Sequence, residues 1–178
     1  GEVTDMARLI MFCILAVVIL GSAIMCITTK RIMRAATFLL FVLFGIAGMY
    51  FVLDYTFLGA AQLSVYAGGI TMMYIFAIQL VSKRTLRGFV EHVKASRVLF
   101  GVLMTLIGIA VVGLVLLKNK FIDMSAQLAN KEVAMSTIGH SLMGSGKYEY
   151  VLPFEFISVF LLACIIGGIM IARKEDKK

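Results

Sequence analysis

The residues of this chain best suited to chemistry lie in the middle of an apolar segment. Gln62, Tyr66 and Gly69 follow one another at i, i+4 and i+7, a spacing that puts all three on one face of a helix. A glutamine amide and a phenol both orient water by hydrogen bonding, but a glutamine cannot titrate. The spacing therefore predicts a mildly polar face at a depth that water could enter.

Two adjacent glycines, Gly68 and Gly69, belong to the same segment. Without side chains they offer little resistance to local rewinding, and π-bulges inside α-helices often occur at functional sites. A second interpretation stays open, because Ala60, Ser64 and Gly68 recur at every fourth residue. Such a stripe of small residues lets membrane helices pack closely. The segment therefore predicts a site that depends on helix shape, either for a change in winding or for packing.

Glu155 is a further candidate, because it is the only carboxylate inside an apolar segment of membrane-spanning length. An ionisable residue within the membrane is a functional hypothesis by default. Glu155 is also about one turn from the outer end of its segment. The alternative is therefore a carboxylate that is stabilised by the helix dipole and reached by water.

The remaining sequence holds no pattern that predicts an active site. It has no nucleotide, haem or metal motif and no nucleophile paired with a base. Cys13, Cys26 and Cys164 fall inside apolar segments without a Cys-x-x-Cys or Cys/His cluster, as expected of small packing residues. We expect no catalytic residue, no metal and no cofactor on this chain, which could not perform a redox reaction or a hydrolysis alone.

Composition predicts a membrane protein. Of the 178 residues, 61% are hydrophobic and 15% are charged, whereas soluble domains average about 25% charged residues. Helices are expected, because backbone groups in lipid must be hydrogen-bonded within their own segment. We predict an all-α polytopic protein with one membrane domain, residues 1–178, and an outer loop, 118–150, that contains a short amphipathic helix. The five predicted spans are about 9–28, 35–53, 57–81, 98–117 and 151–172.

The basic residues predict the orientation in the membrane. On one side, two loops and the tail hold twelve: Lys30, Arg31, Arg34, Lys83, Arg84, Arg87, Lys94, Arg97, Arg173, Lys174, Lys177 and Lys178. The other side holds five: Arg8, Lys118, Lys120, Lys131 and Lys147. This asymmetry puts the amino terminus outside and the carboxyl terminus in the cytoplasm. It also explains the net charge of +7 through contact with membrane lipid, without a nucleic-acid partner.

Two runs of sequence resemble a known family. The run from Gln62 to Phe76, with its Val-Tyr-Ala-Gly-Gly-Ile core, resembles the third helix of subunit J of proton-pumping NADH:quinone oxidoreductase, respiratory complex I. Its mitochondrial counterpart is NADH dehydrogenase subunit 6. The run from Leu152 to Cys164 resembles the last helix of that subunit, and the polar tail after Ala172 resembles its ending. Length and predicted orientation agree as well, so the resemblance covers nearly the whole chain.

The resemblance implies a core membrane-arm subunit without an active site of its own. In the family the third helix carries a π-bulge near the tyrosine and the glycines, so Tyr66, Gly68 and Gly69 would mark the bulge here. Its formation and relaxation would gate a water path that couples quinone reduction to proton translocation. Many members have a glutamate where Gln62 stands, so this chain is expected to orient water at that position without relaying protons.

The same resemblance implies the setting of the chain. The parent complex would use NADH, FMN, iron–sulfur clusters and quinone. The partners would be the small subunits A and K, the quinone-site subunit and the antiporter-like subunits, in a bacterial inner membrane. Two alternatives stay open: a purely structural subunit of complex I, and a small subunit of a related antiporter-type or hydrogenase-type complex. A free-standing channel is disfavoured, because the other spans hold almost no polar groups.

Overall fold

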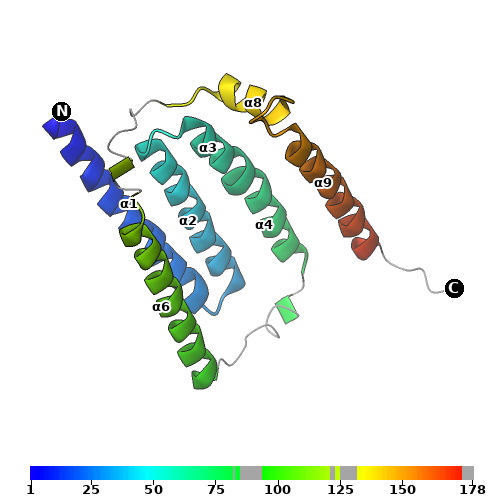
Figure 1. The fold of residues 1–178 in the computed structure, drawn as a ribbon. Coiled ribbons are helices and arrows are strands. Elements are labelled where there is room, and N and C mark those ends of the chain that lie inside the picture. The colour runs from blue at the N-terminus through cyan, green and yellow to red at the C-terminus, as the bar shows by residue number, and fades with distance from the viewer. Residues whose placement is uncertain (82, 85–93, 121–122, 125–131, 174–178) are drawn as a thin grey trace. The chain divides into compact units, whose positions relative to one another are not determined.

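The computed structural model describes residues 1–81, 83–84, 94–120, 123–124 and 132–173, and these residues form helices without any strand (Figure 1). The helices are α1 (Glu2–Thr28), α2 (Ile32–Val52), α3 (Thr56–Ala61), η1 (Gln62–Ile70), α4 (Thr71–Leu80), α6 (Ala95–Lys118), α8 (Met135–Met143) and α9 (Val151–Ala172). Here α3, η1 and α4 form one continuous helix, Thr56–Leu80, called the third membrane helix below. The predicted all-α class is confirmed.

Among the described residues, five helices are long and apolar enough to cross a membrane: α1, α2, the third membrane helix, α6 and α9. The later four helices begin and end within three residues of the expected spans, whereas α1 begins at Glu2 and not near residue 9. Hydropathy alone excluded the charged first turns. Glu2 and Asp5 nevertheless favour helix there, since acidic side chains stabilise the positive end of the helix dipole.

Two compact units make up the chain, Gly1–Glu132 and Val133–Lys178. The prediction of a single membrane domain stays a prediction. Some positions used above lie outside the described residues, namely 121–122 and 125–131 of the outer loop together with Arg87, Lys174, Lys177 and Lys178.

In the first unit, α2 packs against both α1 and the third membrane helix (Figure 1). Small residues make the α1 contact close. A Cβ atom at Gly45 would lie 2.6 Å from Ile19 Cγ1, and one at Gly48 would lie 3.1 Å from Leu15 Cδ2. These positions let the two backbones approach, as small residues do between membrane helices.

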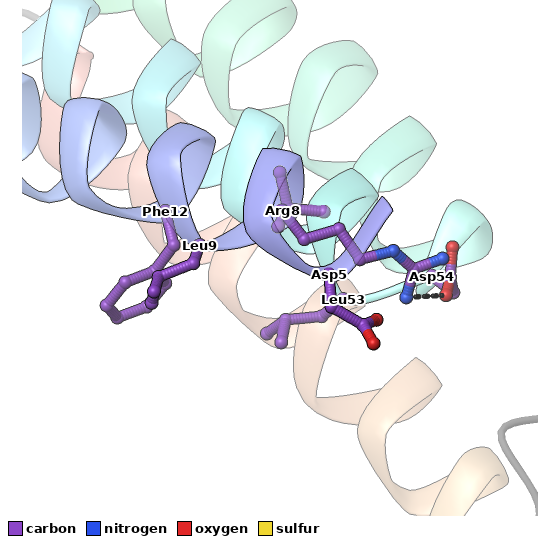
Figure 2. A pocket seen from close by; sticks show the side chains of 7 residues that line it. Asp5, Arg8, Leu9, Phe12, Leu53 and Asp54 are labelled. Atoms are coloured by element: carbon purple, nitrogen blue, oxygen red, sulfur yellow. Dashed lines mark ion pairs between the residues drawn. The ribbon is translucent and has the colours of Figure 1, made fainter. Parts of the chain in front are cut away.

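The turn between α2 and the third membrane helix is a Schellman motif. The Tyr55 N–H donates to the Tyr50 carbonyl at 2.9 Å, and the Asp54 N–H donates to the Phe51 carbonyl at 3.1 Å. Asp54 has a positive φ of 59°, which aspartate tolerates better than most residues. Its carboxylate pairs with Arg8 of α1 at 2.9 Å (Figure 2). This contact joins the tip of the hairpin to α1.

The second unit contains α8 and α9, and α8 is the short amphipathic helix expected in the outer loop. The link between them is held by backbone hydrogen bonds, from the Tyr150 N–H to the Ser141 carbonyl at 2.9 Å and from the Val151 N–H to the Gly144 carbonyl at 3.2 Å. The Glu149 carboxylate also accepts the N–H of Gly146. These bonds fix the entry into α9, the helix that carries Glu155.

Candidate functional site

The centre of the third membrane helix is a π-helix of nine residues, Gln62–Ile70. Its hydrogen bonds span five residues, as in the bond from the Thr71 N–H to the Tyr66 carbonyl. The flanking residues Ala61 and Thr71 keep α-helical dihedrals, so the π segment continues into α3 and α4 without a break. The predicted π feature is therefore present. It extends over more residues than the single turn of a typical π-bulge.

The two glycines differ in what the π-helix requires of them. A Cβ atom at Gly68 would lie 3.0 Å from the Leu63 carbonyl oxygen, five residues earlier in the chain. At Gly69 the nearest atom, the Ser64 carbonyl oxygen, would be 3.9 Å away, an ordinary contact. Gly68 is therefore the position where a missing side chain accommodates the π segment.

The pattern of burial follows the unusual winding. In an unbroken α-helix, the positions that share the face of Gln62 would be Tyr66, Gly69 and Met73. On that pattern Tyr66 should be covered, yet it is 49% exposed, and Met73 is 74% exposed. The covered residues are Ala67, which is 8% exposed, and Thr71, which is 3% exposed. They follow Gln62 by five and nine positions, where an α-helical face would have four and eight. The wider turn has shifted the contact face by one residue.

This shift decides where the predicted site residues lie. Gln62 is 7% exposed, and its Nε2 donates to the Leu43 carbonyl of α2 at 3.4 Å. Tyr66 and Gly69 are exposed and do not share this buried position. The expectation of one polar face formed by Gln62, Tyr66 and Gly69 assumed four-residue winding, and it fails because the helix winds differently from Gln62 onward.

Two residues of the site were missed from sequence. The Tyr74 hydroxyl donates to the Ala36 carbonyl of α2 at 3.3 Å. The buried Thr71 hydroxyl donates to the Tyr66 carbonyl at 2.8 Å, across five residues. A usable signal existed, since Gln62, Thr71 and Tyr74 are polar residues of one apolar helix that align on one face only when an extra residue is wound in.

Glu155 lies in the second turn of α9 and is exposed. Within the described residues of the chain, the one ion pair found is between Arg8 and Asp54, and it does not involve Glu155. In the same residues, no group of three or more His, Cys, Asp or Glu side chains is arranged to hold a metal ion. The π segment and its hydrogen bonds to α2 are therefore the most distinctive feature with functional potential.

Comparison with known proteins identifies the family. Residues 22–171 match the family model of NADH-ubiquinone/plastoquinone oxidoreductase chain 6. A chain 6 of NAD(P)H-quinone oxidoreductase from a Nostoc species is 34% identical, over 94% of this chain and 80% of the relative. The similar chain from Leptolyngbya boryana is 30% identical, over 94% and 81%.

An archaeal relative matches over a greater share of its length. Subunit J of F(420)H(2) dehydrogenase from Methanosarcina mazei is 32% identical, over 100% of this chain and 98% of the relative. The family match covers most of the chain, and the part of the chain that the structure describes has five helices long and apolar enough to span a membrane. The resemblance seen in the sequence is confirmed: this multi-pass membrane protein belongs to the NADH-ubiquinone/plastoquinone oxidoreductase chain 6 family.

Proposed function

We propose that this chain is a membrane subunit of a quinone oxidoreductase complex and that it couples quinone reduction to proton translocation. It would do so by changing the winding of the third membrane helix, which opens or closes a path for water. The π-helix at Gln62–Ile70 is the observation that carries this proposal. A π segment inside an α-helix is seldom neutral and is frequently found at functional sites.

A change between π and α winding would alter the surface of the helix. If Gln62 stays in place, α winding brings Tyr66 toward α2 and turns Ala67 away from it. The bulky, half-exposed phenol of Tyr66 would leave its present surroundings. Such a movement of a large side chain beside two glycines is enough to open or fill a narrow hydrated space.

The π segment also supplies an acceptor for water. Where bonding returns from five-residue to four-residue spacing, one backbone carbonyl loses its N–H partner. A carbonyl oxygen can accept a hydrogen bond from water but cannot carry a proton. No residue from Gln62 to Thr71 has a carboxylate, an imidazole or an amine. In this proposal the chain therefore controls water, while titratable groups of neighbouring subunits carry the protons.

The wider setting follows from the family. The partners would be other membrane-arm subunits, in particular the small subunits A and K, the quinone-site subunit and the antiporter-like subunits. The complex would lie in a bacterial inner membrane with the amino terminus of this chain outside. Relatives are named for different donors, NAD(P)H and F(420)H(2). The donor, and FMN and iron–sulfur clusters with it, would then belong to other chains, and this chain would have no catalytic group.

Deletion of Val65 tests the proposal, because it removes the extra residue and retains the contacts with α2. Val65 is half exposed. Without it, Ala67, Thr71 and Tyr74 lie four, eight and eleven positions after Gln62, which is one face of an ordinary α-helix. The complex should assemble and oxidise its donor, but proton translocation per electron should fall by more than half. Val65→Ala, which keeps the residue count, should behave like the wild type.

A purely structural role is the competing proposal, and the close α1–α2 contact at Gly45 and Gly48 favours it. Under that role, the Val65 deletion would leave proton translocation per electron unchanged, because the packing face is preserved. Full coupling in an assembled Val65-deletion complex would therefore reject the gating proposal.

A further inference from the structure

We infer that two side-chain hydrogen bonds to α2 hold the third membrane helix in its π winding, and that Tyr74 is the positioning residue of this pair. The bonds are Gln62 Nε2 to the Leu43 carbonyl, at 3.4 Å, and the Tyr74 hydroxyl to the Ala36 carbonyl, at 3.3 Å. The first is made by the first residue of the π segment and the second by a residue beyond its end, and the two are called the paired bonds below. This inference rests on the proposed function, since it names the contact that sets the state of the proposed gate.

The acceptors of the paired bonds lie on one stripe of α2. Ala36 and Leu43 are seven residues apart, and positions i and i+7 of an α-helix point in nearly the same direction, within about 20°. The helices run in opposite directions through a short turn, so the earlier donor, Gln62, meets the later acceptor, Leu43. Both donors must therefore lie on a single stripe of the third membrane helix.

Ordinary α winding cannot provide that stripe. Gln62 and Tyr74 are twelve residues apart, and at about 100° per residue their directions would differ by about 120°. Winding one extra residue into the helix removes about 100° and leaves about 20°. Both side chains then face α2, as observed. The two hydrogen bonds are compatible with each other because the segment between them is π-helical.

Conversion to α winding must therefore break one of the paired bonds. With Gln62 still bound to Leu43, the part of the helix after the segment would turn by about 100°, and Tyr74 would leave Ala36. Met73 would take its place, and a methionine thioether has no proton to donate. The Tyr74 hydroxyl thus stabilises the π state specifically, unlike a contact that both states can make.

The Thr71 hydroxyl, in contrast, makes a hydrogen bond that does not favour the π winding over the α winding. It bonds to the carbonyl five residues earlier, the same carbonyl that accepts the Thr71 N–H. Thr28, Thr37, Thr105 and Ser158 bond to the carbonyl four residues earlier. A Thr71 hydroxyl can therefore follow the backbone into either winding. Its acceptor changes with the winding, whereas the Tyr74 hydrogen bond stabilises the π state.

The test uses the purified parent complex and Tyr74→Phe, which removes the hydroxyl and keeps the ring. Tyr55→Phe, at an exposed residue of the turn, is the control. Both are made together with Gly68→Ala, which weakens the π segment in advance through the contact with Leu63. Electron-microscopy maps sorted by the winding of residues 62–70 give the ratio of α to π. Loss of one hydrogen bond should raise this ratio by roughly two- to tenfold with Tyr74→Phe.

The readouts separate this inference from the proposed function. An equal ratio in the Tyr74→Phe and Tyr55→Phe complexes would overturn the role of Tyr74, whatever the helix does in turnover. Suppose instead that the ratio of α to π is higher in the Tyr74→Phe complex than in the Tyr55→Phe complex. If proton translocation per electron is the same in the two, the result would support the role of Tyr74 and reject the gate. A raised ratio with reduced translocation would support both.

Discussion

The Tyr74 hydroxyl of the third membrane helix donates to the carbonyl oxygen of Ala36 on α2, at 3.3 Å. Residues that follow Gln62 by twelve positions would normally point about 120° away from it. Tyr74 faces the same helix as Gln62 because the segment Gln62–Ile70 is wound as a π-helix. A single interhelical hydrogen bond therefore reports the winding of the whole segment and links local geometry to the proposed gate.

The two glycines of the π segment should respond differently to the same substitution. Gly68→Ala places a methyl group 3.0 Å from the Leu63 carbonyl in the π state, whereas Gly69→Ala meets nothing closer than 3.9 Å. Alanine also favours α-helix over glycine at both positions, by about 1 kcal/mol, so the difference isolates the contact. We expect assembled complexes in both cases, with proton translocation per electron reduced for Gly68→Ala and near normal for Gly69→Ala.

Simultaneous measurement of donor oxidation and vesicle acidification gives the number of protons translocated per electron directly. Equal numbers of protons translocated per electron in the two alanine variants would show that the Gly68 contact does not control coupling. Loss of the subunit from both complexes would instead favour the structural role.

The α1–α2 contact should affect assembly of the complex and should not affect proton translocation per electron. In Gly45→Val, the new side chain would collide with Ile19, whose Cγ1 lies 2.6 Å from the Cβ position. Overpacking of this kind typically costs about 1–3 kcal/mol. Gly21→Val in α1 is the matched control, because nothing lies within 4 Å of that Cβ position. We expect less subunit in purified membranes for Gly45→Val than for Gly21→Val; equal amounts would contradict the packing account.

The stability of the turn at Asp54 should depend more on the backbone conformation of this residue than on its ion pair with Arg8. Arg8 and Asp54 are 47% and 46% exposed, so their pairing should contribute less than about 1 kcal/mol. Proline cannot adopt the φ of 59° and lacks the N–H that bonds to Phe51. Asp54→Gly should therefore leave complex yield almost unchanged, whereas Asp54→Pro should lower it sharply. A yield that falls equally with Arg8→Ala and Asp54→Pro would show that the ion pair dominates.

Thr71→Val should leave the winding unchanged, despite removing a buried hydrogen bond of 2.8 Å. The substitution removes a hydroxyl that can donate to a backbone carbonyl in both windings, and valine has nearly the shape of threonine. Maps of this variant should give the wild-type ratio of α to π. A marked loss of π winding would mean that the Thr71 hydroxyl stabilises the π state by itself, and the special role assigned to Tyr74 would need revision.

The membrane helices could be predicted from sequence, because continuous apolar runs of about 20 residues have no other stable structure in lipid. The π winding could not be predicted from the hydrophobic pattern, since the segment from Gln62 to Ile70 is apolar enough for a membrane span in either winding. Gly68 and Gly69 left a change in winding open beside packing, and the family resemblance led to the expectation of a π-bulge. The burial of Gln62 against α2 and the hydrogen bonds of Thr71 and Tyr74 were missed for one reason. Faces were assigned with the α-helical period, which places every residue after the π segment on the wrong side.

In the proposed mechanism, the winding of residues 62–70 changes as the complex works. The most direct test is a pair of high-resolution maps of the parent complex, one resting and one trapped in turnover, each resolved well enough to trace the backbone of the third membrane helix. If the helix is a gate, one state should show π winding with Tyr74 bonded to Ala36. In the other state, part of the particles should show α winding with that bond broken. The same π-helix with Tyr74 bonded to Ala36 in every class of both maps would contradict the proposed mechanism.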